Sequence, residues 1–256
     1  LAQTLNYASK ELAKTDSLQK ELISNISHDL RTPLTMIKGY GEVIRDIPGE
    51  NTPENVQVII DETTRLSELV SDMLDLSRIQ SGTRKLQYEC FCITDIVKDT
   101  LCRYEKLRMQ EGYSIEFIAD EDAYVMADRG MILQVIYNLI NNAINYTGDD
   151  KSVVVSQKCT ETGVRISVAD TGMGIEPEHL TQIWQRYYRL DKVHKRATVG
   201  TGLGLSIVKE ALEAHGAFYG VESSVGNGST FWFELPMTEI SDIFDAKYDN
   251  SENKDL

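Results

Sequence analysis

Apolar residues in the first third of the chain recur every three or four positions, over residues 22–44 and again over residues 56–77. This spacing places the apolar side chains on one face of an α-helix. Between the two segments, residues 46–53 read DIPGENTP, and the prolines and the glycine favour a turn. The pattern therefore predicts two long helices joined as a hairpin.

A hairpin of two amphipathic helices leaves part of its apolar surface in contact with water. We therefore predict that two copies of residues 22–82 associate into an all-α four-helix bundle. Residues 1–21 carry scattered leucines on a polar background, which predicts a signalling helix or coiled coil that continues the first helix upstream.

The pattern changes after Gly82, where strand-like segments alternate with helical ones. Strands are predicted over residues 113–118, 124–127, 153–156, 164–169 and 229–235, and helices over residues 129–146 and 203–215. Asp128 is a suitable N-cap for the first of these helices, and Gly216 is a suitable end for the second. This mixture predicts a second domain over residues 83–237, an α+β sandwich with helices on one face of a sheet, and an acidic flexible tail over residues 238–256.

Composition narrows the class of protein. Of the 256 residues 41% are apolar, with no continuous apolar run long enough to cross a bilayer. The 40 acidic residues outnumber the 26 basic ones, and the formal charge of −14 opposes binding to nucleic acid. The cysteines at positions 90, 92, 102 and 159 lack CxxC spacing, so neither a zinc site nor a disulfide framework is indicated.

The polar start at Leu1 is not a signal peptide, and we expect further residues upstream of it.

The segment SHDLRTPLT, residues 27–35, contains a candidate nucleophile on the first predicted helix. A single helical histidine is usually a surface or packing residue, but the neighbours of His28 favour chemistry. Neutral imidazole attacks phosphorus without a strong base, and the adjacent Asp29 can hold the proton on the second ring nitrogen. Thr32 lies one turn further on the same face, where its hydroxyl can orient a water, and Pro33 is expected to bend the helix.

Three later segments have the residue types of a nucleotide site. Asn138 and Asn142 lie one turn apart on a predicted helix, and DTGMGI, residues 170–175, follows a predicted strand. GTGLGL, residues 200–205, opens another predicted helix, whose N-terminal amides can meet phosphate oxygens. Each segment is a weak signal alone, because glycine-rich turns and solvent-facing asparagines are common. The chain has no GxxxxGK[ST] motif, which excludes the usual P-loop.

Together with LSELVSDMLDLSRIQSG, residues 66–82, these motifs resemble those of bacterial sensor histidine kinases, and the similarity extends over nearly the whole chain. The resemblance implies a dimerisation and histidine phosphotransfer domain over residues 22–82. It also implies an ATP-binding catalytic domain over residues 83–237, with the histidine-kinase/Hsp90-type ATPase fold. Its cofactors would be ATP and Mg²⁺.

The resemblance also implies roles for individual residues. His28 is the phosphorylated residue, Asn138 binds Mg²⁺ and Asn142 approaches the phosphates, whereas Asn141 lies off their face. Asp170 accepts a hydrogen bond from the adenine amino group, and Gly172 and Gly174 let the backbone approach the base. The further nucleotide-binding residues are Tyr146, Gly200, Thr201, Gly202, Leu203 and Gly204.

The sequence departs from the family pattern at a few positions. The span over residues 176–199 is expected to be a lid over the nucleotide, and within it IWQRYYR replaces the usual IFERFYR. We expect aromatic packing to survive this change, in which Trp184 and Tyr187 replace phenylalanines. Asn145 stands where the family often has lysine or arginine, so one charge near the phosphates is missing.

The predicted function is an ATP-dependent, homodimeric protein-histidine kinase that autophosphorylates His28 and transfers the phosphoryl group to an aspartate of a response-regulator receiver domain. Phosphatase activity toward the same partner, using Thr32, is a further hypothesis. The chain would be the cytoplasmic portion of a cell-membrane protein, with transmembrane segments upstream of Leu1.

Two alternatives remain at this point. An ATPase clamp of the same nucleotide-binding superfamily would use ATP to close a dimer, and SHDLRTPLT and the predicted hairpin argue against it. A non-catalytic signalling scaffold would keep the fold without nucleotide chemistry, and the presence of Asn138, Asn142 and Asp170 argues against that.

Overall fold

The computed structural model describes residues 27, 29–80, 86–186, 188 and 202–238. The chain divides into two compact units, one formed by residues up to Asp75 with residues 201–203, and the other by residues 76–200 and 204–256. The boundary between the units falls within α2, the helix over Pro53–Gln80.

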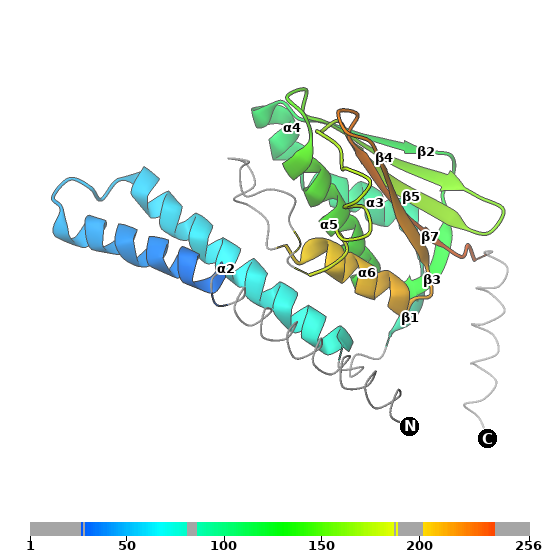
Figure 1. Ribbon diagram of the computed structural model, residues 1–256, viewed down its shortest axis with the longest axis horizontal. Helices are drawn as coiled ribbons and strands as arrows, with labels where there is room; N and C mark the ends of the chain where they lie inside the picture. Colours follow the sequence, from blue (N-terminus) through cyan, green and yellow to red (C-terminus); the bar gives the residue numbers. More distant parts are fainter. Residues whose placement is uncertain (1–26, 28, 81–85, 187, 189–201, 239–256) are drawn as a thin grey trace, which may run out of the picture. The chain divides into compact units, whose positions relative to one another are not determined.

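Both helices predicted for the first unit are present (Figure 1). The first runs over residues 29–46 and continues without a break through Pro33. The second, α2, starts after a cap in which the backbone N–H of Asn55 donates to Thr52 Oγ1 at 3.2 Å. Pro53 suits the first helical position because the backbone N–H that it lacks would have no partner within the helix there. The sequence TPEN therefore sets the start of α2.

The helical unit buries few of its apolar side chains. Among the described side chains of residues 29–75 only Pro33 and Leu69 are buried. Its exposed large apolar residues are Leu34, Met36, Ile47, Val56, Ile60, Val70 and Leu74. None of the described helices combines the length and the hydropathy that a membrane span needs.

The second unit is built on a mixed sheet of five strands in the order β2-β4-β5-β7-β6 (Figure 1). The strands are β2 (Ser114–Ala119), β4 (Ser152–Cys159), β5 (Val164–Asp170), β7 (Ser229–Leu235) and β6 (Phe218–Ser223). β2 pairs parallel with β4, and the other three pairs are antiparallel. The strand predictions over residues 113–118, 153–156, 164–169 and 229–235 are therefore confirmed, whereas β6 was not among them.

A separate two-stranded sheet differs from the sequence prediction. The strand predicted over residues 124–127 is present as β3 (Tyr124–Asp128), but it pairs with β1 (Tyr88–Cys92) and not with the main sheet. β1 and the two helices that follow it along the chain, α3 (Ile93–Cys102) and α4 (Glu105–Glu111), were not predicted.

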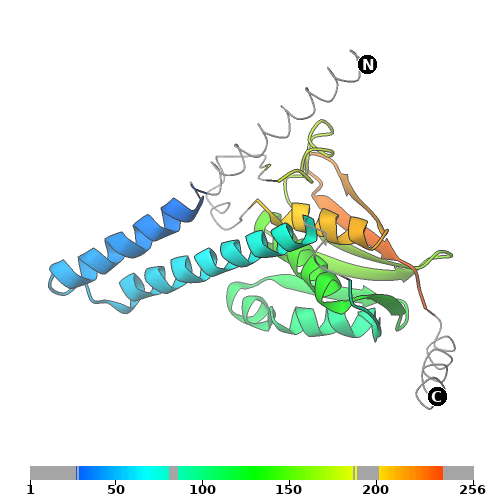
Figure 2. The same cartoon turned by 90° about the horizontal axis from the view of Figure 1, so that it is seen from below.

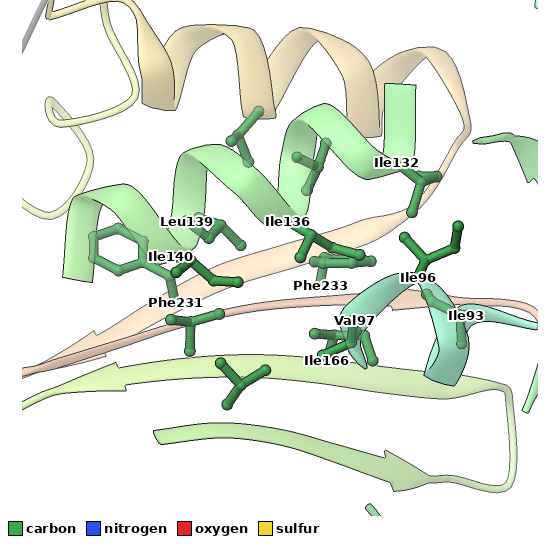
Figure 3. Packing of buried hydrophobic residues seen from close by; sticks show 14 of the residues in the cluster. Ile93, Ile96, Val97, Ile132, Ile136, Leu139, Ile140, Ile166, Phe231 and Phe233 are labelled. Atoms are coloured by element: carbon green, nitrogen blue, oxygen red, sulfur yellow. The ribbon is translucent and has the colours of Figure 1, made fainter. Parts of the chain in front are cut away.

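Helices cover one face of the main sheet and form the core with it (Figure 2). These are α3, α5 (Arg129–Tyr146) and α6 (Gly204–Ala214). Along β5 every second residue is buried, so Ile166 and Val168 face the helices. Figure 3 shows Ile136 and Leu139 of α5 and Phe231 and Phe233 of β7 in this core. The predicted sandwich with helices on one face is confirmed.

The opposite face of the sheet carries polar and aromatic side chains. Arg165 of β5 lies over the ring of Trp232 of β7, with the guanidinium carbon 4.2 Å from the ring centroid. Arg165 also pairs with Glu234, which accepts hydrogen bonds from Thr160 and Thr162. These contacts hold the turn between β4 and β5 against β7.

The start of α5 and the end of α6 are joined by a hydrogen bond. Asp128 Oδ1 accepts a hydrogen bond from the backbone N–H of Met131 at 3.0 Å, which confirms the predicted N-cap of α5. The backbone N–H of Asp128 donates to Nε2 of His215, just after the end of α6, also at 3.0 Å. Gly216 has the left-handed φ of +64° that ends the helix as predicted. α5 and α6 are therefore fixed side by side.

Candidate functional site

The loop after β5 presents a buried carboxylate. Asp170 is the last residue of β5, and its Oδ1 accepts hydrogen bonds from the backbone N–H of Gly172 at 2.8 Å and of Ser229 at 3.3 Å. Burial raises the pKa of this carboxyl group, and the two backbone hydrogen bonds oppose that shift. Asp170 is therefore an acceptor held in one orientation.

Two glycines allow the Asp170 loop to pack closely against neighbouring backbone. A Cβ added to Gly172 would lie 1.9 Å from the carbonyl oxygen of Tyr146, at the end of α5. One added to Gly174, whose φ is +73°, would lie 2.0 Å from the carbonyl oxygen of Ser224. No other residue fits either position without movement of the backbone. The glycines of DTGMGI are thus needed for the shape of the loop itself.

Asn138 of α5 lies next to the first residue of α6. Its Oδ1 is 3.5 Å from the point that a Cβ on Gly204 would occupy. Its Nδ2 is buried and has no hydrogen-bond partner within the part of the chain that the structure describes. A buried amide without a partner is costly, and phosphate oxygens would accept its hydrogen bond. The amide oxygen is a hard ligand that suits Mg²⁺, so this side chain fits the predicted role.

Asn141 and Asn142 of α5 differ in what the structure shows of them. Asn142, half-buried, follows Asn138 by one turn. Asn141 instead accepts a hydrogen bond from the hydroxyl of Tyr104 at 2.8 Å. Tyr104 is buried, which raises the pKa of its phenol, and it stacks on Tyr137. Asn141 is thus committed to a contact with the segment between α3 and α4.

The glycine-rich segment before α6 is partly described. Gly200 and Thr201 lie outside the described residues. Gly202 has a φ of +69°, Leu203 is fully buried and Gly204 is the first residue of α6. Helix α6 therefore begins inside the predicted GTGLGL motif.

The segment that follows the Asp170 loop is anchored by an aromatic residue. The ring of Trp184 meets Tyr219 of β6 edge-on at 4.9 Å and Phe231 of β7 at 5.8 Å between centroids. Arg186 makes an ion pair with Glu210 of α6 at 3.0 Å. The expected aromatic packing is thus seen at Trp184, whereas Tyr187 and residues 189–199 lie outside the described residues.

The residues of the predicted phosphorylation site are only partly described. His28 lies outside the described residues. Asp29 is half-buried and Thr32 is exposed, and both belong to the helix over residues 29–46. The structure therefore leaves the predicted roles of these three residues untested.

Comparison with known proteins finds a matching family model for a part of each unit. The family described as "His Kinase A (phospho-acceptor) domain" matches residues 18–82, and the one described as "Histidine kinase-, DNA gyrase B-, and HSP90-like ATPase" matches residues 127–239. The sensor histidine kinase WalK of Bacillus subtilis (strain 168) is 36% identical over 238 residues, which cover 91% of this chain and 39% of WalK.

Solved structures agree with this relationship. The catalytic domain of the histidine kinase ThkA is 31% identical, with a TM-score of 0.52 over 59% of this chain and 95% of that one. ThkA in complex with the response regulator protein TrrA matches 88% of this chain and 64% of that one, with 26% identity and a TM-score of 0.68. This chain belongs to the sensor histidine kinases.

The chain spans 39% of the length of the curated relatives WalK and SrrB of Staphylococcus aureus. In the α/β unit, the structure places several of the predicted site residues close to one another. Gly172 packs on the backbone of Tyr146, and Asn138 lies beside Gly204. Asp170 shares the loop with Gly172 and Gly174.

Sequence reasoning missed a second set of residues around Asp170. A Cβ on Gly148 would lie 2.8 Å from the carbonyl oxygen of Thr171, and one on Gly228 would lie 2.0 Å from that of Asp170. Ser229 donates its backbone N–H to the Asp170 carboxylate. The GNGS of residues 226–229 is a signal of a tight turn, but only the pairing of β5 with β7 brings that turn to Asp170.

Proposed function

We propose that this chain is the kinase core of an ATP-dependent protein-histidine kinase. It binds ATP with Mg²⁺ on the α/β unit and transfers the γ-phosphoryl group to His28, from which an aspartate of a response-regulator receiver domain receives it. One observation carries the proposal: an acceptor-domain match that includes His28 and an ATPase match that includes Asn138 and Asp170 lie in the same chain.

The α/β unit supplies the groups for nucleotide binding. Asp170, already oriented by two backbone N–H groups, accepts a hydrogen bond from the adenine amino group. Gly172 and Gly174 let the loop pack closely on the backbone of Tyr146 and Ser224, and so set the shape in which the loop would receive the base. The rest of the nucleotide would be bound by Asn142, Tyr146 and residues 200–204. Asn138 would hold Mg²⁺, which neutralises phosphate charge when bound.

At His28, a neutral ring nitrogen attacks the γ-phosphorus of ATP. A phosphorus–nitrogen bond forms as the bond to the β,γ-bridging oxygen breaks, and ADP leaves with that oxygen. Asp29 stabilises the positive charge on the ring by holding the proton on the other nitrogen. A carboxylate oxygen of the receiver domain then attacks the same phosphorus and regenerates His28.

A homodimer is part of the proposal. The helices over residues 29–46 and Pro53–Gln80 expose large apolar residues, among them Leu34, Ile60 and Leu74, which are each about half exposed. A second copy of the hairpin is the partner that would cover these residues in a four-helix bundle. Light scattering of the purified chain tests this, and a monomer at micromolar concentration would contradict it.

The decisive experiment uses ATP radiolabelled at the γ-phosphate. The wild-type chain should acquire label that is labile to acid and stable to base, and His28→Ala should acquire none. Lys38→Ala is the matched control, since it truncates an exposed side chain on the helix over residues 29–46 and should label normally. Label retained by His28→Ala would contradict the assignment.

Measurements of ATP hydrolysis and of ATP-analogue binding separate the two alternative functions. Rapid ATP hydrolysis that is unaffected by His28→Ala would favour an ATPase clamp. Failure of the wild-type chain to bind an ATP analogue would favour a scaffold without nucleotide chemistry. Asp170→Asn should reduce both nucleotide binding and labelling, because the amide replaces one carboxylate oxygen by a donor.

Phosphatase activity toward the receiver domain is a second part of the proposal. Thr32 is exposed on its helix and follows His28 by four residues, so its hydroxyl can orient a water for hydrolysis. Thr32→Ala should slow dephosphorylation of a phosphorylated receiver, and an unchanged rate would remove this role.

The predicted cellular context also stays a proposal. ATP and receiver domains are cytoplasmic, so this part of the protein would lie in the cytoplasm, joined to the membrane through segments upstream of Leu1. The sequence upstream of Leu1 in the gene tests this directly.

A further inference from the structure

The Asp170 loop is tied at both ends to one cross-strand pair of β6 and β7. Ser223 and Ser229 are register partners at the end of the β6–β7 ladder. Ser229 is also the register partner of Asp170 in the β5–β7 ladder, and its backbone N–H donates to Asp170 Oδ1. At the other end of the loop, the backbone N–H of Ile175 donates to Ser223 Oγ at 2.9 Å.

Every hydrogen-bonding position of the Ser223 hydroxyl is used. Its proton is donated to the carbonyl oxygen of Gly228 at 2.8 Å. Its oxygen accepts from the backbone N–H of Ile175 and lies 3.0 Å from Ser229 Oγ. Because the only proton of Ser223 is already donated, Ser229 is the donor in this second contact. Removal of this one hydroxyl therefore leaves three groups without their partner.

The turn between β6 and β7 also supports the middle of the loop. The backbone N–H of Gly226 donates to the carbonyl oxygen of Met173 at 2.7 Å. The carbonyl of Ser224 packs under Gly174, and Gly228 packs on the carbonyl of Asp170. The hairpin therefore fixes the loop backbone at its start, its middle and its end, and Ser223 fixes the hairpin turn to the loop.

We propose that Ser223 is a positioning residue for nucleotide binding, which acts by holding residues 170–175 in the conformation that receives the base. This inference rests on the proposed binding of ATP at Asp170. Ser223 itself need not touch the nucleotide. A loop that is already ordered loses little conformational entropy on binding, so the hydroxyl raises affinity without taking part in phosphoryl transfer.

The test compares Ser223→Ala with Ser167→Ala in the full chain. Ser167 lies on β5, on the sheet face away from the helices, and is the matched control. Ser223→Ala should raise the dissociation constant of a fluorescent ATP analogue, and the KM for ATP, by about tenfold, because it leaves a buried donor unsatisfied. The autophosphorylation rate at saturating ATP should not change. Ser167→Ala should match wild type, and Ser223→Thr should restore most of the affinity.

Hydrogen exchange gives a readout that separates loop ordering from general stability. In Ser223→Ala the backbone amides of residues 171–176 should exchange faster, while those of α5 keep their protection. An affinity equal to wild type would overturn the inference, as would a fall in maximal rate at unchanged KM. If Ser223→Ala does not fold, Ser223→Cys, with a weaker donor and acceptor, decides by the same criteria. Absence of binding by the wild-type chain would instead refute the proposed function.

Discussion

The helical hairpin and the α/β unit bury their apolar residues to very different extents. In the α/β unit Ile93, Ile132 and Ile136 are fully buried, whereas Ile60 and Leu74 of the hairpin are about half exposed. The α/β unit thus has its own hydrophobic core, formed between the sheet and the helices on one of its faces. The described side chains of the hairpin form no core of comparable depth, so we expect its stability to depend on a surface supplied from elsewhere.

Truncating one large apolar side chain in each region should give the largest difference in the free energy of unfolding. Ile136→Ala creates a cavity in the core of the α/β unit and should lower the free energy of unfolding by about 2–5 kcal/mol. Ile60→Ala, at a position that is half exposed in one copy, should lower the free energy of unfolding by less, because only the proposed second copy would cover its side chain. Urea unfolding followed by circular dichroism measures both, and equal losses would contradict the comparison.

Glycine-to-alanine substitutions sharpen the contrast between the two regions. Gly172→Ala places a methyl group against the Tyr146 carbonyl, so we expect a loss of about 1–3 kcal/mol and loss of ATP-analogue binding. Gly41→Ala adds a methyl group that meets nothing within 4 Å, in the helix over residues 29–46. It should stabilise that helix by about 0.5–1 kcal/mol. Thermal unfolding of the two variants should therefore shift in opposite directions.

The smallest expected effect is a pH dependence that arises from two carboxyl groups with pKa values shifted in opposite directions. In the hairpin, hydrogen bonds from Arg45 lower the pKa of Asp46, so any stabilisation it gives is present above its unfolded pKa and is lost as the pH falls. Burial raises the pKa of Asp170 in the α/β unit, so its charged form costs stability above its folded pKa and protonation relieves that cost.

The affinity for nucleotide should reflect the raised pKa of Asp170, because the proposed hydrogen bond from the adenine amino group needs the charged carboxylate. We expect the affinity for an ATP analogue to fall on acidification, starting above the ordinary carboxyl pKa of about 3.9. Asp170→Asn should bind more weakly at all pH values and lose this part of the dependence, so comparison with it removes the titration of the ligand's own phosphates. A parallel pH dependence in both proteins would exclude Asp170 as its source.

The sequence predicted those elements whose pattern repeats over several turns or ends at a clear cap. Helix α5 has the predicted bounds because apolar residues recur along it and Asp128 marks its start. Strands β4 and β5 followed from alternation and from their β-branched residues. The two long helices of the hairpin were set by spacing and by the turn before Pro53.

The missed elements give weaker local signals. Helix α3 has an apolar period, with Ile93, Ile96 and Val97 buried, but it is short and begins after Cys92, which makes no side-chain capping bond. Helix α4 has no buried residues and hence no apolar period. Strand β6 lies at the edge of the sheet, with Phe218 exposed and Gly220 packed on the ring of Trp232. Its pattern therefore does not alternate cleanly.

The candidate site was predictable only where its residues are close in the sequence. Asp170, Gly172 and Gly174 stand in one motif, and the position of a buried acceptor between glycines follows from that motif. The contribution of Ser223 and Ser229 arises from contacts that strand pairing makes across 48 and 59 positions, which no local pattern encodes. The role of His28, outside the described residues, stays a prediction.

The placement of the two tryptophans offers an optical probe of the nucleotide site. Trp184 packs on Tyr219 and Phe231 directly after the Asp170 loop, whereas Trp232 lies under Arg165 on the other face of the sheet. The chain has no other tryptophan. Trp232→Phe would therefore leave Trp184 as the single tryptophan, whose emission, excited apart from that of the tyrosines, we expect to change on nucleotide binding without any attached dye.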